Sequence, residues 1–220
     1  MTGAGDATIA VVDYHKGNLL SVARSADDVG ATVELTDDPA RIEAADGIIL
    51  PGVGAFEDAM TYLRTSGQEC AIRTAVGRGV PFLGICLGLH LLLERGNEAR
   101  DGWVDGLGLM RGQATRLPDT RLKVPHVGWD QVHLTERGAA CPLFSGVPEG
   151  ANLYFTHSFA ADAMDSAQVA GYTHYGRSFP SVVWEGSVFG VQFHPEKSSG
   201  VGLRILHNFV NVVRAARDAS

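Results

Sequence analysis

The sequence predicts an α/β fold in which a mostly parallel central sheet is flanked by helices and carries a small antiparallel addition. In the first half of the chain, short apolar segments alternate with helical ones, as in βαβ units. After Gly112 several short extended segments follow one another. The 220 residues contain no repeat, low-complexity tract or linker, so we expect one domain spanning residues 1–220, with residues 1–7 disordered.

The first half supplies the parallel part of the sheet. Short runs rich in Ile, Val and Leu predict strands at 9–13, 32–35, 47–50 and 80–85. Apolar residues at helical spacing predict helices at 21–29, 56–66, 68–78 and 87–94. These helices are the expected crossovers between parallel neighbours.

The second half supplies the antiparallel addition and the last parallel strand. Extended segments are predicted at 113–116, 130–133, 152–157, 169–172 and 182–185. A buried strand is then expected at 188–193, and a closing amphipathic helix at 201–217.

Cys86 stands where the strand at 80–85 should turn sharply into a helix. Gly84 and Gly88, two residues on either side, permit the tight turn seen in nucleophile elbows of the Gly-x-Ser-x-Gly kind. The helix N-terminus favours thiolate, the nucleophilic form, over thiol. Cys86 is therefore a candidate nucleophile; the alternative is a buried structural cysteine.

His194 and Glu196 follow the last predicted strand, separated by the restricting Pro195. In a cysteine hydrolase, histidine is the base and a carboxylate orients it. Parallel strands end at a common edge, which would bring these residues to Cys86. The alternative for His194 is a hydrogen-bonded histidine at a strand end.

The glycine-rich turn at 51–54 follows another parallel strand and should open at the same edge. An acyl-transfer site needs amide donors for the developing oxyanion, and Val53 and Leu87 can supply them. An ordinary turn or a phosphate loop are the alternatives. No Gly-Lys-Ser/Thr ending follows, which argues against a nucleotide P-loop.

Composition excludes several classes of function. The formal net charge is −7 and the basic residues are scattered, so no nucleic-acid surface is expected. No apolar run approaches ~18 residues, and no leader pattern opens the chain, so no membrane contact is expected. Cys70, Cys86 and Cys141 are widely spaced and odd in number, which favours a reducing cytoplasm. The histidine spacing builds no metal site, so we expect neither metal nor cofactor.

Together these segments resemble the class I, or triad-type, glutamine amidotransferases. The elbow at 84–88 and the Phe193-His194-Pro195-Glu196 run carry the general resemblance. The glutaminase-subunit family of imidazole glycerol phosphate synthases is a narrower match, and the resemblance covers nearly the whole chain from Ile9. Its motifs here are the segments 13–19, 51–56, 125–129, 154–159 and 192–198.

The resemblance implies a flavodoxin-like fold and a step of histidine biosynthesis. Cys86 would attack the side-chain amide of glutamine, His194 would protonate the departing ammonia, and water would release glutamate. The ammonia would pass to a separate (βα)₈-barrel cyclase subunit, bound as a heterodimer. That subunit would form imidazole glycerol phosphate and aminoimidazole carboxamide ribonucleotide.

The resemblance also assigns residues to binding. The Gly52 loop, His90 and the segment His157, Ser158 and Phe159 would hold glutamine. The positions that would face the cyclase are Asn18, Trp129, Tyr154 and Lys197, with Lys197 paired to an acidic residue there. Rearrangement of the turn at 51–54 would couple hydrolysis to occupancy of the cyclase, if the Val53 amide points away at rest.

Two positions depart from the family pattern. His90 stands where the family usually has glutamine, about one helical turn beyond Cys86. An imidazole cannot reproduce the paired donor and acceptor of a carboxamide, so we expect weakened or re-oriented glutamine binding. Asp130 stands after Trp129, where asparagine is frequent.

Three other functions stay open from the sequence. The chain could serve a different synthase, because the triad does not name the ammonia acceptor. It could be a standalone γ-glutamyl hydrolase that needs no partner. It could also be a non-catalytic interaction protein, although an intact Cys86, His194 and Glu196 argue against that.

Overall fold

The structure, a computed structural model, describes residues 7–16, 19–119 and 122–219. Residues 1–6, expected to be disordered, and Asn18, expected at the partner face, lie outside the described residues. Ala7 is described and is buried against the core.

Five parallel strands form one half of the main sheet. Across the sheet they follow the order β2 (Thr32–Thr36), β1 (Thr8–Val12), β3 (Gly47–Leu50), β4 (Phe82–Ile85) and β13 (Val188–Val191). The first strand of the chain thus lies between two neighbours, and the last lies beside β4, the strand that leads into Cys86. Four of the five are apolar runs buried on both faces, as expected for parallel strands covered by helices. The strands at 47–50 and 113–116 have the predicted bounds.

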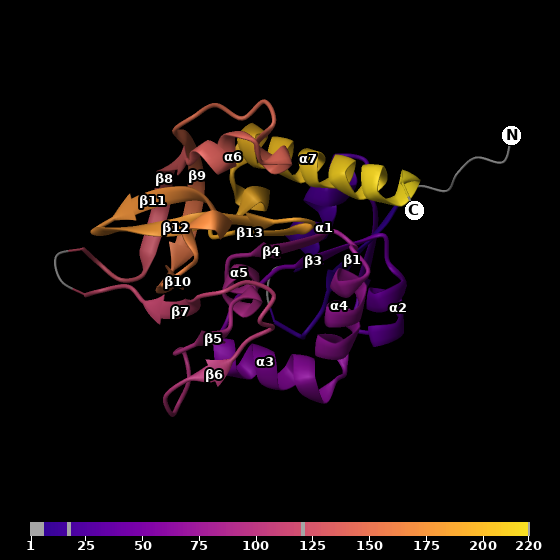
Figure 1. The fold of residues 1–220 in the computed structure, drawn as a ribbon, viewed down its shortest axis with the longest axis horizontal. Helices are drawn as coiled ribbons and strands as arrows, with labels where there is room; N and C mark the ends of the chain where they lie inside the picture. Colours follow the sequence, from indigo (N-terminus) through magenta and orange to yellow (C-terminus); the bar gives the residue numbers. More distant parts are fainter. Residues whose placement is uncertain (1–6, 17–18, 120–121, 220) are drawn as a thin grey trace, which may run out of the picture.

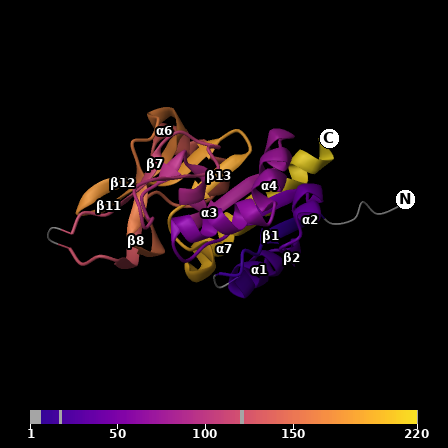
Figure 2. The ribbon, with the colours of Figure 1, turned by 90° about the horizontal axis from the view of Figure 1, so that it is seen from below.

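Helices cover both faces of this half (Figure 1). On one face α1 (Leu19–Asp28) packs beside α7 (Ser199–Asp218), which runs along the upper side of the sheet in Figure 1. The other face is covered by α2 (Pro39–Ala44), α3 (Phe56–Thr65), α4 (Gln68–Gly77) and α5 (Leu87–Leu92). Figure 2 shows α3 and α4 in front of the sheet. Two hydrophobic clusters, one on each face, make up the core.

The antiparallel addition is larger than the sequence predicted. Four antiparallel strands extend the main sheet: β12 (Arg177–Glu185), β11 (Val169–Tyr175), β8 (His126–Leu134) and β9 (Ala151–His157). A second sheet joins β10 (Phe159–Asp162), β7 (Gln113–Arg116), β5 (Arg95–Gly96) and β6 (Val104–Asp105). The short helix α6 (Glu136–Ala139) follows β8.

The sheet order positions the site. Strands β4 and β13 are parallel neighbours, with Ile85 paired to Val191. The chain therefore leaves both strands at the same edge, Cys86 directly after one and His194 shortly after the other. β9 crosses this edge, since the His194 amide donates to the Tyr154 carbonyl at 2.9 Å.

Candidate active site

Cys86 occupies a strained turn between β4 and α5. Its backbone angles, φ 55° and ψ −106°, lie in a region that side-chain-bearing residues rarely adopt. A Cβ at Gly84 would lie 2.5 Å from the Gly88 carbonyl oxygen, and one at Gly88 would lie 1.9 Å from the Leu50 carbonyl oxygen. Both glycines are therefore required by close backbone approach, and the elbow predicted from the sequence is present.

His194 and Glu196 form a buried hydrogen-bonded pair. The distance from His194 Nδ1 to Glu196 Oε1 is 2.8 Å, and the short 3₁₀ turn Pro195–Lys197 fixes both side chains. Burial lowers the pKa of His194, but interactions with Cys86 and Glu196 outweigh it and raise this pKa above its ordinary value. Glu196 thus holds one ring nitrogen of His194, while the other, Nε2, is buried without a hydrogen-bond partner among the described residues.

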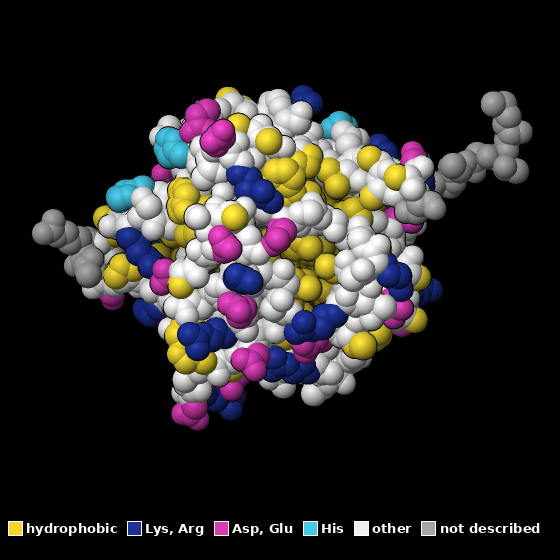
Figure 3. Space-filling view, in the orientation of Figure 1, with side chains coloured by type: hydrophobic (Ala, Val, Ile, Leu, Met, Phe, Trp, Pro, Cys, Tyr) yellow, Lys and Arg dark blue, Asp and Glu magenta, His cyan; other side chains and the backbone are white. Residues whose placement is uncertain are grey.

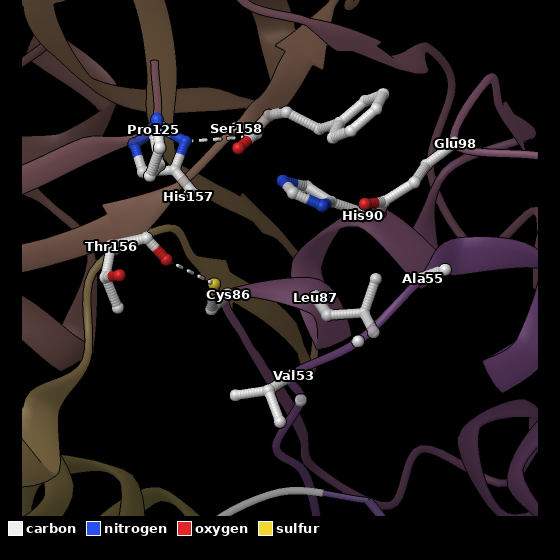
Figure 4. A pocket seen from close by; sticks show the side chains of 13 residues that line it. Val53, Ala55, Cys86, Leu87, His90, Glu98, Pro125, Thr156, His157 and Ser158 are labelled. Atoms are coloured by element: carbon white, nitrogen blue, oxygen red, sulfur yellow. Dashed lines mark hydrogen bonds between the residues drawn. The ribbon is translucent and has the colours of Figure 1, made fainter. Parts of the chain in front are cut away.

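A pocket of about 510 Å³ opens above the Cys86 sulfur (Figure 4). It is lined by Gly52, Val53, Gly54, Ala55, Cys86, Leu87, His90, Glu98, Pro125, Thr156, His157, Ser158 and Phe159. The sulfur lies 3.9 Å from the Thr156 carbonyl oxygen. All five residues predicted to hold substrate line this one pocket.

The turn at 51–54 packs closely against the elbow. A Cβ at Gly52 would lie 2.6 Å from the Tyr14 hydroxyl oxygen and 2.7 Å from Leu87 Cβ. Leu87 is the first residue of α5, so its amide has no acceptor within the helix. Val53 and Leu87, the predicted oxyanion donors, therefore stand at the same pocket wall.

Tyr14, which lies in the motif at 13–19 but was given no role of its own from the sequence, is a neighbour of this turn. Burial raises the pKa of its phenol, the adjacent Cys86 raises it further, and the Val53 backbone amide opposes the rise. The hydroxyl is therefore neutral, and it is buried without a hydrogen-bond partner among the described residues. No spacing in the sequence relates Tyr14 to position 53.

His90 is buried and lies between the pocket and the sheet. Its Nε2 is 2.8 Å from the side-chain oxygen of Gln192, whose amide nitrogen is 3.7 Å from the Cys86 sulfur. Burial lowers the pKa of His90 to about 4, so its ring is neutral near pH 7. Gln192 stands in the motif at 192–198, but sequence reasoning gave it no role of its own.

His157, Ser158 and Phe159 form the corner between β9 and β10. His157 Nδ1 is 2.7 Å from the Phe159 carbonyl oxygen, and the Ser158 carbonyl accepts from the Leu117 amide at 2.8 Å. Burial, the largest cause, lowers the pKa of His157 to about 3. The corner is therefore a fixed, uncharged wall of the pocket.

Glu98 is a pocket residue that sequence reasoning missed. It lies in the irregular segment between β5 and β6, and its Oε2 accepts from the Phe56 amide at 3.3 Å. Partial burial raises the pKa of this carboxyl. An isolated acidic residue outside any strand or helix offers no periodic signal, so only the fold reveals its position.

Three of the four predicted partner-facing residues cluster on the surface near the pocket. Trp129 is 53% exposed, and its ring meets Tyr154 edge-on at 6.0 Å between centroids. The Lys197 ammonium lies 5.8 Å from the centre of the Tyr154 ring. An exposed tryptophan beside a tyrosine and a cation is typical of interface anchors.

The remaining surface carries charges of both signs. In Figure 3, Lys and Arg side chains are interspersed with Asp and Glu over the face shown. Within residues 7–16, 19–119 and 122–219, no group of three or more His, Cys, Asp or Glu side chains is arranged to hold a metal ion. In the same ranges no helix combines the length and apolarity needed to cross a membrane.

Solved structures share this fold at low sequence identity. A putative GMP synthase protein from Thermoplasma acidophilum superimposes with a TM-score of 0.74, at 18% identity over 97% of each chain. PurLQS from Thermotoga maritima gives a TM-score of 0.70, also at 18% identity, over 94% of this chain and 99% of that one.

Sequence relatives are much closer. The HisH component of imidazole glycerol phosphate synthase from Moorella thermoacetica is 51% identical over 96% of this chain and 98% of that protein. The HisH protein from Symbiobacterium thermophilum is 45% identical over 94% of this chain and 95% of that protein. The family described as glutamine amidotransferase class-I matches residues 10–213. With a cysteine elbow, a His–Glu pair and these relatives, the chain belongs to the class I glutamine amidotransferases and, within them, to the family of HisH subunits of imidazole glycerol phosphate synthase.

Proposed function

We propose that this chain is the glutaminase subunit of imidazole glycerol phosphate synthase in histidine biosynthesis. The proposal is carried by one observation: the Cys86 elbow lines the same pocket as the predicted substrate residues, and the buried His194–Glu196 pair follows the neighbouring parallel strand at the same sheet edge. Relatives at 42–51% identity that bear this subunit's name support the assignment.

In the first step the Cys86 sulfur attacks the side-chain carbonyl carbon of glutamine. A C–S bond forms, and the carbonyl oxygen becomes an oxyanion stabilised by the amides of Leu87 and Val53. As the tetrahedral intermediate collapses, the C–N bond breaks and His194 gives its proton to the leaving nitrogen, which departs as ammonia. Glu196 holds the imidazole and stabilises its cation.

In the second step water attacks the thioester. His194, now neutral, takes a proton from the water while the new C–O bond forms. The C–S bond then breaks, glutamate is released, and the Cys86 thiolate and the His194 imidazolium are restored. No cofactor enters either step.

Glu98 adds a role that the sequence did not suggest. Its carboxylate is the acidic group of the pocket, across from the backbone corner at 157–159 (Figure 4). A carboxylate in this position suits the α-ammonium group of glutamine, while the amides of the corner and of the Gly52 loop suit the α-carboxylate. His90 would contribute the wall between them.

The cluster of Trp129, Tyr154 and Lys197 is the proposed docking surface for the cyclase. Ammonia is protonated in water, so a covered path to a second active site requires a partner seated over this edge. The barrel fold of that partner and the heterodimer follow from the family resemblance. We also place the enzyme in the cytoplasm, supported by Cys70, Cys86 and Cys141, which are free.

The test measures glutamate release from glutamine with and without a purified barrel cyclase and its nucleotide ligand, using Cys86→Ala as the blank. Strong activation in the full mixture is expected. Equal activity with and without the cyclase would instead indicate a standalone hydrolase. If the full mixture releases no glutamate, the glutaminase assignment is refuted.

A further inference from the structure

A line of polar side chains joins Asp130 of β8 to the pocket wall. His126 of β8 and His157 of β9 are cross-strand partners, and His126 Nδ1 is 3.0 Å from His157 Nε2. His157 Nδ1 is 2.7 Å from the Phe159 carbonyl oxygen in the pocket wall. At the other end, His126 Nε2 is 3.5 Å from Oδ2 of Asp130, the residue after Trp129.

The direction of each hydrogen bond follows from the carbonyl at one end. A carbonyl oxygen only accepts, so His157 Nδ1 carries the ring proton and donates to Phe159. His157 is neutral near pH 7, since burial lowers its pKa to about 3, and its Nε2 therefore accepts. His126 must then donate from Nδ1.

This leaves His126 Nε2 as the variable position. When His126 is neutral, its Nε2 lone pair faces the Asp130 carboxylate, and two acceptors oppose each other. When His126 is protonated, the imidazolium donates to Asp130 from one nitrogen and to His157 from the other. The line is then complete from Asp130 to the Phe159 carbonyl.

Among the described residues, His157 and Asp130 are the polar side chains next to the His126 ring nitrogens. Its ring is buried and stacks on Tyr175 of β11, with centroids 4.0 Å apart, and on Phe155 of β9, at 5.0 Å. The Tyr175 hydroxyl donates to the Lys123 carbonyl and so turns away from the imidazole. Burial lowers the pKa of His126, and the Asp130 carboxylate opposes that effect. His157 also experiences His90 and His194, both of which disfavour a charge on it.

We propose that Asp130, His126 and His157 form a positioning relay that fixes the glutamine-binding corner at 157–159 from strand β8, and that the relay is complete only when His126 carries both ring protons. The expected effect of the relay on glutamine binding rests on the proposed function. The expected protonation pattern of the two histidines does not. The three are positioning residues, because they act on substrate through the backbone of the corner.

The first test is independent of activity. Nitrogen-15 NMR of the histidine rings in the full chain identifies which nitrogens carry protons between pH 5 and 9. The expected result is a proton on Nδ1 of His157 throughout, and on Nδ1 of His126 at high pH, with Nε2 of His126 taking up a proton on acidification. A proton on Nε2 of neutral His126 would overturn the relay whether or not the chain is a glutaminase.

The second test uses Asp130→Asn, which keeps the size of the side chain and adds an amide donor toward Nε2 of neutral His126. In the complex with saturating cyclase, the KM for glutamine of the unchanged protein should rise about fivefold as His126 loses its proton, the worth of about one hydrogen bond. In Asp130→Asn the KM should stay low across this pH range, with kcat following the same profile in both proteins.

Glu149→Gln is the matched control, since Glu149 pairs with the exposed His133 of the same strand at 3.0 Å and has no link to the pocket corner. It should reproduce the KM profile of the unchanged protein. Identical profiles for Asp130→Asn and the unchanged protein would contradict the relay. Inactivity of the unchanged complex would instead refute the proposed function and leave the NMR result to decide the relay.

Discussion

The side-chain oxygen of Gln192 lies 2.8 Å from Nε2 of His90. Because that oxygen faces His90, the amide nitrogen of Gln192 faces the Cys86 sulfur at 3.7 Å. A donor toward the sulfur stabilises the thiolate. His90, placed where the family usually has glutamine, thus sets which end of the Gln192 amide meets the nucleophile.

Replacing Gln192 by Met should weaken the nucleophile. Met has similar volume but no donor, so the thiolate loses a charge-assisted hydrogen bond, which is typically worth about 1.5–3 kcal/mol. We expect kcat/KM to fall about tenfold or more and the pH midpoint of Cys86 alkylation to rise. An unchanged alkylation profile would show that the Gln192 amide does not act on the sulfur.

His90→Gln should change substrate binding more than chemistry. A carboxamide supplies both a donor and an acceptor, so it can hold Gln192 and reach the pocket at once. We expect the KM for glutamine to fall about fivefold with little change in kcat. Equal KM values for both proteins would mean that His90 does not limit glutamine binding.

The buried His90 should make stability fall in acid. Its pKa is about 4 in the folded protein and 6.5 when unfolded, so the unfolded chain binds more protons between these values. The free energy of unfolding is therefore unaffected by His90 above pH 6.5 and decreases as the pH falls toward 4. Between pH 7.5 and 5 the loss is about 2 kcal/mol.

Urea unfolding at those two pH values measures this effect. His90→Gln should lose correspondingly less stability than the unchanged protein over the same interval. His133→Gln, at an exposed histidine on β8, serves as the comparison and should leave the pH dependence as it is. If His90→Gln and the unchanged protein lose the same stability between these pH values, His90 is not the source of the loss.

Tyr14→Phe should raise glutaminase activity in the absence of the cyclase. The Tyr14 hydroxyl is buried against the turn that carries Val53 and has no hydrogen-bond partner among the described residues, so we expect it to compete with the oxyanion for the Val53 amide. Without the hydroxyl, Val53 should be freer to face the pocket, raising basal kcat several-fold, within the about 10²–10³ that one oxyanion donor supplies. Activity with cyclase and ligand should change much less. A fall in both activities would assign Tyr14 a supporting role instead.

Trp129→Ala should weaken the complex with the cyclase. The exposed ring, supported edge-on by Tyr154, has the properties of an interface anchor, and such residues are worth about 2 kcal/mol or more. We expect the Kd to rise about thirtyfold in a titration of the two proteins. Trp103→Ala, at an exposed tryptophan on the segment before β6, is the control and should bind normally.

The parallel half of the fold was predictable from the sequence because each buried strand is a continuous apolar run with its own crossover helix. The helix α2 was missed, since six residues are too few to show a helical period, and β5 and β6 were missed because each is only two residues long. The extent of β8 was underestimated because His126, Gly128 and Asp130 interrupt its alternation.

The positions of the Cys86 elbow and of the His194–Glu196 pair were predictable because each is a local motif at a strand end. Contacts between distant segments were not predictable in the same way. Glu98, Tyr14 and Gln192 reach the pocket or the nucleophile through the packing of separate elements. Tyr14 and Gln192 lie in family motifs, but the local sequence around these three residues does not indicate which distant segments they contact.

The contact between Gly88 and the Leu50 carbonyl has a consequence for directed evolution of this enzyme. Through this contact strand β3 limits how closely the helix that follows the nucleophile can approach the sheet, although β3 contributes no reacting group. Variants that shift β3 by a few tenths of an ångström would change the position of the Cys86 sulfur relative to the carbonyl carbon that it attacks. Selections for altered reactivity should therefore recover substitutions in the interior beneath β3, alongside those in the pocket.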